Sequence, residues 1–256
     1  TLNTDGRGIA TMTLSRPEKR NALSGEMIER LAALVKDVAT NDDIRVLILA
    51  AADPVFCSGG DLAWMRAQMV ADAGTRRKEA TALAMMLKAL NEIPKPVVAR
   101  VQGDAFGGGL GLMAVCDAVI ATDNARFGLT ETRLGLIPAT IGPYVVARVG
   151  VGKARRFYVS PRLFGAEEAK DLGLVSRIVS DKDLDDAVEE EALSYLKAAP
   201  GAVAEGKALL RRLAEPIDQE VIDASIDALV ARWESPEAEE GTRAFFDKRR
   251  PLWDVD

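Results

Sequence analysis

The sequence predicts an α/β fold followed by a helical C-terminal third. Segments of strand and helix character alternate through the first two thirds of the chain, with apolar runs of strand length at 45–51, 97–103 and 117–123. No strand pattern follows residue 183. A chain of 256 residues is long enough for one large domain, or for one domain with an appended arm, so no second independent domain is required.

The first strand and helix follow from the spacing of apolar residues. Residues 8–15 alternate between apolar and polar side chains, as in a half-buried strand, and the polar loop after them ends at Ser24, which can cap a helix. The predicted helix has apolar residues at helical spacing, namely Met27, Leu31, Leu34, Val35 and Val38. Residues 45–51 are then a continuous apolar run, which is typical of a strand in a sheet covered on both faces.

The same plan repeats along the next segment. A helix rich in Ala, Leu and Met is predicted over 80–90, followed by a strand over 97–103. A buried helix is predicted to begin at Leu112, directly after a cluster of glycines, and a third strand follows over 117–123.

The C-terminal part is predicted to be largely helical. Residues 166–179 contain a helix that stops at Gly173 and then a short strand. Helical patterns follow over 201–213 and 217–233. We therefore expect a core over residues 1–195 and a helical region over 196–256, which together form one functional unit.

Composition narrows the classes of partner and compartment. The net charge is −6, and the basic clusters are too short for a nucleic-acid or membrane patch, so we expect neither partner. No apolar run approaches the roughly 18 residues of a membrane span, and the N-terminal residues lack a signal-peptide core. We therefore expect a cytoplasmic protein.

The sequence contains no histidine and only two cysteines, Cys57 and Cys116. The lack of histidine excludes Ser-His and Cys-His nucleophilic catalysis, a histidine base and most zinc sites. The two cysteines are too few for a disulfide framework and lack metal-ligand spacing, so we expect no metal. Any catalytic acid or base must be a carboxylate, lysine, tyrosine or cysteine.

Two glycine-bearing turns, within 46–62 and 97–112, each follow an apolar strand and open a helix. Such helix N-termini present free backbone N–H groups, so two adjacent turns would form a pair of donors for an anionic oxygen. A phosphate cradle is the competing explanation, but GGGLG is not G-x-G-x-x-G and no G-K-[ST] occurs. Tight packing of strand against helix remains the other explanation for the glycines.

Five segments together resemble the enoyl-CoA hydratase/isomerase (crotonase) family: FCSGGDL, VQGDAFGGGLGLMAVCD, ARFGLTETRLGLIPA, AEEAKDLGLVSRIV and FFDKRRPLW. The match spans almost the whole chain in the family's order. The resemblance implies a crotonase (ClpP/crotonase-like) spiral of ββα units with a C-terminal helical trimerisation region, assembled as a homotrimer or homohexamer. It also implies acyl-CoA thioester substrates, with CoA as part of the substrate and no separate cofactor.

The resemblance also implies the catalytic groups. By motif position, the backbone N–H groups of Ser58 and Gly108 would stabilise the negative charge that develops on the thioester oxygen. Glu131, in FGLTETRLG, matches one of the two glutamates that typical hydratases use for proton transfer. The other position is Gly111, which has no side chain, so Glu131 would act alone as acid and base. The alternative for Glu131 is a surface residue or helix cap.

The resemblance further implies three groups of CoA-contacting residues. The loop over 16–22 resembles the stretch that wraps the adenine and pantetheine, through Arg16, Lys19, Arg20 and Ala22. The first glycine turn contributes Ser58, Gly60, Asp61 and Leu62. Near the C-terminus, Lys248 matches a position that approaches CoA phosphate, often from the neighbouring subunit, and Phe245 packs beside it.

Several of these residues also have a purely structural explanation. Asp61 is predicted to cap a helix, and Lys248 would suit an exposed helix end. Trp64 and Met65 either line the acyl pocket or belong to the core.

Within the family, GGGLGL together with TETRLGLIPATIGPYVVARVG resembles bacterial 3-methylglutaconyl-CoA hydratases of leucine degradation. The leading hypothesis is a lyase that hydrates an α,β-unsaturated acyl-CoA, with 3-methylglutaconyl-CoA as the candidate substrate. Its carboxylate would meet a cation or amide donors, for which Arg66 and Arg133 are candidates unless they are ordinary surface arginines. The alternatives are an isomerase, or another crotonase-type thioester reaction that uses Glu131 alone, and a non-catalytic acyl-CoA binding paralogue.

Overall fold

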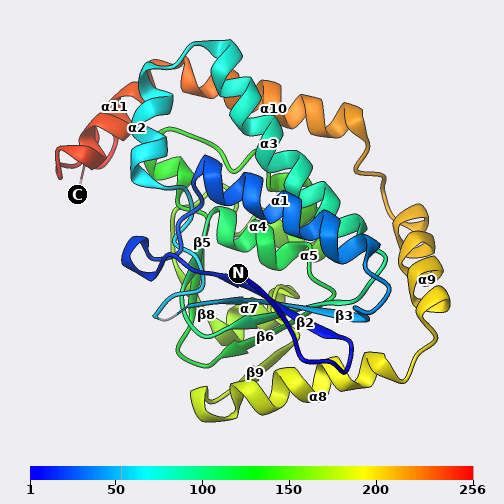
Figure 1. The fold of residues 1–256 in the computed structure, drawn as a ribbon. Helices are drawn as coiled ribbons and strands as arrows, with labels where there is room; N and C mark the ends of the chain where they lie inside the picture. Colours follow the sequence, from blue (N-terminus) through cyan, green and yellow to red (C-terminus); the bar gives the residue numbers. More distant parts are fainter. Residues whose placement is uncertain (53, 256) are drawn as a thin grey trace.

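A six-stranded sheet forms the centre of the structure, a computed structural model that describes residues 1–52 and 54–255 (Figure 1). β1 is antiparallel to β2, and the other neighbouring strands are parallel. In spatial order the strands are β1 (Leu2–Thr4), β2 (Ile9–Leu14), β3 (Val46–Ala51), β4 (Val97–Val101), β6 (Ala118–Thr122) and β9 (Arg177–Val179). The predicted α/β class and the predicted strands are confirmed.

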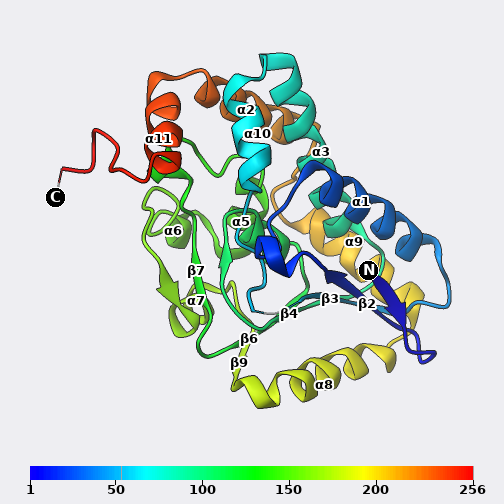
Figure 2. The ribbon, with the colours of Figure 1, turned by 60° about the vertical axis from the view of Figure 1, so that its left-hand side comes forward.

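Helices cover both faces of this sheet (Figure 2). α8 packs on one face against β3, β4 and β6, whereas α1, α3, α4 and α5 lie over the other. The helices are α1 (Gly25–Thr40), α2 (Leu62–Val70), α3 (Ala73–Glu92), α4 (Gly108–Ala114), α5 (Gly142–Val149), α6 (Val151–Ala154), α7 (Ala166–Leu172), α8 (Leu184–Leu196), α9 (Pro200–Leu213), α10 (Gln219–Trp233) and α11 (Pro236–Phe246). Short 3₁₀ helices are η1 (Pro17–Lys19), η2 (Glu131–Leu134) and η3 (Asp181–Asp183).

The strands feed two cores because successive side chains point to opposite faces of the sheet. In β3, Val46 and Ile48 pack with the core under α8, whereas Leu47 and Leu49 pack with the larger core under α1 and α3. This explains why the strand reads as an uninterrupted apolar run.

Two predicted helix boundaries, at Ser24 and Gly173, follow from capping, whereas the helix predicted over 80–90 spans Ala73–Glu92. The Ser24 hydroxyl accepts a hydrogen bond from the Met27 N–H at 3.3 Å, as expected for an N-cap. Gly173 ends α7 in the left-handed conformation, with φ of 90°.

α4 begins at Gly108 rather than at the predicted Leu112. The glycine cluster itself forms the first turn, because it packs against the turn that follows β3. A Cβ on Gly109 would lie 2.8 Å from the Cys57 carbonyl oxygen. The same region carries a second sheet of three strands, β5 (Ala105–Phe106), β7 (Arg126–Gly128) and β8 (Phe164–Gly165).

The last three helices wrap the edge of the molecule (Figure 1). α9 stands to one side, α10 packs against α3, and α11 packs against η2. The division at residue 195 stays a prediction, and residue 256 lies outside the described residues. Among the described helices, none has the length and apolar character needed to cross a membrane.

Candidate active site

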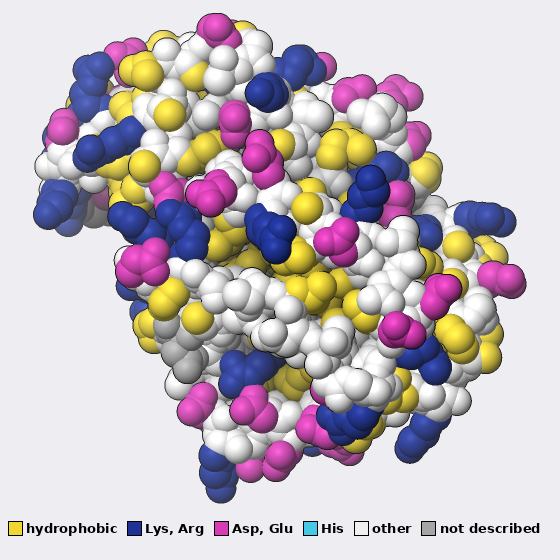
Figure 3. Space-filling model, viewed as in Figure 1, with side chains coloured by type: hydrophobic (Ala, Val, Ile, Leu, Met, Phe, Trp, Pro, Cys, Tyr) yellow, Lys and Arg dark blue, Asp and Glu magenta, His cyan; other side chains and the backbone are white. Residues whose placement is uncertain are grey.

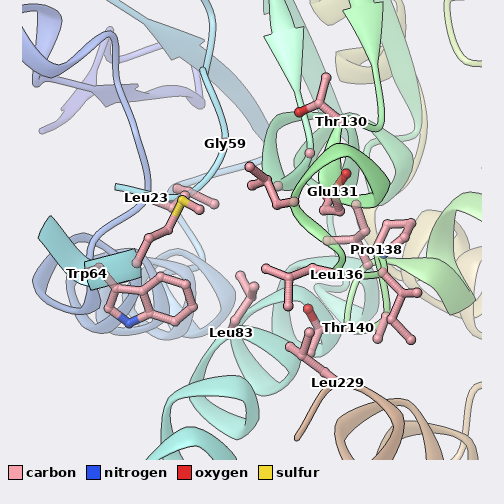
Figure 4. A pocket seen from close by; sticks show the side chains of 18 of the residues that line it. Leu23, Gly59, Trp64, Leu83, Thr130, Glu131, Leu136, Pro138, Thr140 and Leu229 are labelled. Carbon is pink, nitrogen blue, oxygen red and sulfur yellow. The ribbon is translucent and has the colours of Figure 1, made fainter. Parts of the chain in front are cut away.

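A pocket of about 330 Å³ lies between the two glycine-bearing turns, the segment 130–141 and the helices α2, α3 and α10 (Figure 4). Its walls are largely apolar. Trp64, Met65 and Leu83 line it from α2 and α3, and Leu229 and Trp233 line it from α10. Trp64 and Met65 are predicted either to line the acyl pocket or to belong to the core, and both line this pocket.

Glu131 begins η2 and is the acidic side chain among the described residues of this lining. Its Oε2 is buried and has no hydrogen-bond partner among the described residues. This burial raises the pKa of Glu131 to about 7. A carboxyl group that is half protonated near neutral pH can both accept and release a proton during a reaction.

Two backbone N–H groups beside Glu131 are free to receive a ligand. Neither Gly60 nor Gly108 donates a backbone hydrogen bond among the described residues, and both line the pocket. The two turns are in close contact, since a Cβ on Gly107 would lie 3.8 Å from the Gly59 Cα. The two turns therefore bring N–H groups without a backbone partner to one pocket, and the role of Gly108 as a donor to a thioester oxygen stays a prediction.

The prediction that the Ser58 N–H is the other donor is wrong. Its N–H donates to the carbonyl oxygen of Arg20 at 3.1 Å, so it is not available to a thioester oxygen. The N–H groups of the next two residues, Gly59 and Gly60, donate no backbone hydrogen bond among the described residues. The sequence placed Gly60 among the CoA contacts only, because the pairing of each N–H depends on a loop more than thirty residues away.

That loop is held by Asn21, which the sequence analysis did not single out. Arg20 and Asn21 have φ of 53° and 52°, so the chain turns sharply there. The buried Asn21 amide donates to the carbonyl oxygens of Ala52 and Val55 at 2.6 and 2.8 Å. It thus ties the 16–22 loop to the turn that presents Gly60.

Asp61 caps α2, as predicted. Its Oδ1 accepts hydrogen bonds from the N–H groups of Ala63 and Trp64 at 2.8 and 3.2 Å, and its Oδ2 pairs with the Arg16 guanidinium at 3.1 Å. Burial alone would raise the pKa of Asp61, but these hydrogen bonds and Arg16 hold it below its ordinary value. Asp61 is therefore an ionised structural group, and Arg16 is engaged in holding the turn.

The remaining residues predicted to contact CoA divide into two sets. Ser58, Gly60, Leu62 and Phe245 line the pocket, and Leu62 and Phe245 are exposed at its mouth. A second set lies outside the lining: Arg16, Lys19, Arg20, Ala22, Asp61 and Lys248. Of these, Lys19, Arg20 and Lys248 are exposed, and Ala22 is buried.

The two arginines predicted as candidates to bind a substrate carboxylate differ in position. Arg133 lines the pocket and is exposed. Arg66 is absent from the described lining, and its guanidinium lies 4.4 Å from the ring centroid of Phe246. Arg66 therefore links α2 to α11 instead of facing the acyl group.

Gly111 lies one helical turn after Gly108, and a neighbouring side chain occupies the space beside it. A Cβ on Gly111 would lie 2.4 Å from Cγ2 of Ile141 and 2.9 Å from its Cβ. Ile141 is itself buried in the pocket wall. A second carboxylate cannot enter from position 111 without displacing Ile141.

Comparisons with known proteins agree with this geometry. A family model described as enoyl-CoA hydratase/isomerase matches residues 4–255. The Bacillus subtilis protein YngF, whose name refers to the same activity, is 34% identical over 257 residues that cover 96% of this chain and 94% of YngF.

Two solved structures have a similar fold over almost the whole chain. An enoyl-CoA hydratase from Shewanella pealeana is 37% identical with a TM-score of 0.81, covering 99% of this chain and 95% of that one. Pseudomonas aeruginosa AtuE is also 37% identical with a TM-score of 0.81, covering 99% of this chain and 98% of its own.

Proposed function

Because the chain belongs to the enoyl-CoA hydratase/isomerase family, we propose that it is a hydro-lyase that adds water to an α,β-unsaturated acyl-CoA thioester or removes it. One observation carries the proposal: a buried carboxyl group with a pKa of about 7 lines the same pocket as two free backbone N–H groups. 3-Methylglutaconyl-CoA is the proposed substrate.

The geometry supports a stepwise addition. The Glu131 carboxylate takes a proton from water, and the water oxygen forms a bond to Cβ. The C=C electron pair moves toward the thioester, whose oxygen becomes an enolate oxygen bound by the N–H groups of Gly60 and Gly108. The protonated Glu131 then gives its proton to Cα, the enolate electrons form the new C–H bond, and the carboxylate is restored.

Isomerisation is the second candidate, and the contact between Gly111 and Ile141 favours it. With one carboxylate in the site, Glu131 would take a proton from Cγ and return it to Cα while the same two N–H groups hold the enolate oxygen. This reaction needs no bound water. Its product has the mass of the substrate, whereas hydration adds the mass of water.

CoA is proposed to bind across the pocket mouth. Leu62 and Phe245 offer apolar contacts there, and Lys19, Arg20 and Lys248 are exposed cations for its phosphates. In Figure 3, Lys and Arg side chains lie among acidic and apolar ones on the side of the molecule that carries α2 and α11. Arg16, Ala22 and Asp61 are proposed to shape the loop that carries these contacts.

A homotrimer or homohexamer in the cytoplasm is also proposed. α9, described in full, buries none of its side chains. Leu209, Leu210 and Leu213 are 54%, 68% and 75% exposed on it. An apolar ridge of this kind is typical of a subunit contact, and light scattering of the purified protein would report the number of copies.

The first test is turnover of 3-methylglutaconyl-CoA beside crotonyl-CoA, with products separated by mass. We expect water addition that prefers the carboxylated substrate and falls at least about 100-fold in Glu131→Gln, with thioester affinity retained. A product of unchanged mass would support isomerisation. Tight binding with neither reaction, or unchanged turnover in the variant, would contradict the assignment of Glu131.

A further inference from the structure

Thr140 is a buried polar residue in the apolar part of the pocket. It is 5% exposed and lies between Leu136 and Leu229 in the pocket wall (Figure 4). No described side-chain hydrogen bond involves its hydroxyl, and the hydroxyl oxygen is not among the fully enclosed atoms without a partner, so it is open to the pocket. A hydroxyl that faces an apolar pocket without a protein partner favours a ligand or water that completes it.

The same residue stands at the N-terminus of a helix. Ile141 is the N-cap of α5, which spans Gly142–Val149. Among the described residues, the N–H groups of Thr140 and Ile141 donate no backbone hydrogen bond, whereas that of Gly142 donates to Ala139 at 3.0 Å. Free N–H groups and the positive end of the helix dipole favour a negatively charged ligand group.

No buried basic side chain lines the inner pocket near Thr140 among the described residues. Among the described residues of the lining, Arg133 is the basic side chain, and it is exposed. Arg66 stacks on Phe246. An anion in the inner pocket would therefore depend on Thr140 and the start of α5.

We propose that the Thr140 hydroxyl, at the N-terminus of α5, receives a carboxylate at the far end of the substrate's acyl chain. The proposal rests on the proposed function and narrows its substrate class to acyl-CoA thioesters with a second, chain-terminal carboxylate. Thr140 would then select the substrate, while Glu131 transfers protons.

Two saturated thioesters test this, because neither can be hydrated. 3-Methylglutaryl-CoA and 3-methylbutyryl-CoA differ by one carboxylate, and calorimetry gives the affinity of each. We expect Thr140→Val to weaken binding of 3-methylglutaryl-CoA about tenfold or more and to change 3-methylbutyryl-CoA less than about twofold. Thr140→Ser should restore most of the lost affinity, and Thr140→Val should not lower Tm, because the hydroxyl has no protein partner to lose.

Other outcomes would overturn the proposal. Equal weakening of both thioesters, or a lower Tm, would give Thr140 a structural role. Weakening of 3-methylglutaryl-CoA by Arg133→Gln but not by Thr140→Val would move the carboxylate to Arg133. Failure of the proposed function is distinguishable: normal binding of both thioesters with no hydration would remove the hydratase activity and leave the binding result intact.

Discussion

Glu131 occupies the space in front of Gly107. An ideal Cβ on Gly107 would lie 2.9 Å from Oε1 of Glu131, and the Gly107 backbone has φ of 48° and ψ of −115°. A residue with a side chain would thus meet the carboxylate and would also be strained. The glycine cluster therefore leaves room for the Glu131 carboxylate, the proposed acid and base, and also carries one of the proposed N–H donors.

Gly107→Ala should lower turnover at least about tenfold, because the methyl group displaces the Glu131 carboxylate from its position by a distance that matters for proton transfer. Gly150→Ala is the matched control: Gly150 has φ of 78° but nothing within 4 Å of an added Cβ. The control should lose stability from backbone strain and keep its activity. Equal losses of turnover in the two variants would show that strain alone is responsible.

The raised pKa of Glu131 predicts two effects of pH. As a base it must be ionised, so kcat/KM should rise with pH up to about 7 and then level off. Between its ordinary value of 4.5 and about 7, the folded chain holds a proton that the unfolded chain has released. Stability from this group is therefore present below pH 4.5 and is lost as pH rises through about 7, by about 3 kcal/mol.

Denaturant unfolding of wild type and Glu131→Gln at pH 5 and pH 8 measures that loss. The difference in unfolding free energy between the two proteins should shift in favour of the variant at pH 8. Only the change of this difference with pH tests the pKa, because replacing the carboxyl group by an amide alters stability equally at pH 5 and pH 8. A difference that is the same at both pH values would place the pKa of Glu131 near its ordinary range.

Gly60 allows its N–H to be tested directly. A Cβ there would meet Met65 and Trp64 at 3.7 and 3.8 Å, which is ordinary contact, so Gly60→Ala should keep both fold and activity. Gly60→Pro removes the N–H and should lower kcat by about 100- to 1000-fold. Ser58→Ala should stay within about threefold of wild type, because it removes only the hydroxyl and keeps the backbone N–H that donates to the Arg20 carbonyl oxygen. Thermal melts of all three would identify any variant that loses activity by unfolding.

The packing of Ile141 against Gly111 predicts how a second carboxylate could be introduced. Gly111→Glu alone should destabilise the protein by about 1–3 kcal/mol, because the new side chain meets Ile141. Adding Ile141→Gly should recover part of this loss, whereas Ile141→Ala would leave a Cβ only 2.9 Å away.

Activity of the double variant then tests the mechanism. Gly111→Glu with Ile141→Gly should hydrate crotonyl-CoA at least about tenfold faster than Ile141→Gly alone, because a second carboxylate can hold the water. No gain in a folded double variant would mean that the position beside Ile141 does not face the reacting carbons.

The sequence by itself determined the features that depend on local pattern. The strands and the caps at Ser24, Asp61 and Gly173 follow from side-chain periodicity and from hydrogen bonds within a few residues. The motif around Glu131 likewise marks it as the candidate acid and base.

Only the tertiary structure decided which groups meet in the pocket. The Arg20 carbonyl oxygen accepts a hydrogen bond from the Ser58 N–H, whereas the Gly60 N–H has no such partner among the described residues. Ile141 fills the space beside Gly111. Leu229 lines the same pocket as Glu131, although the two are about one hundred residues apart in the sequence. These relationships join distant parts of the chain, and a hydrogen bond or a steric contact exists only once its partner has been brought within a few ångströms. The sequence pattern therefore predicts which residue types can react, and the packing determines which N–H groups and side chains reach the pocket.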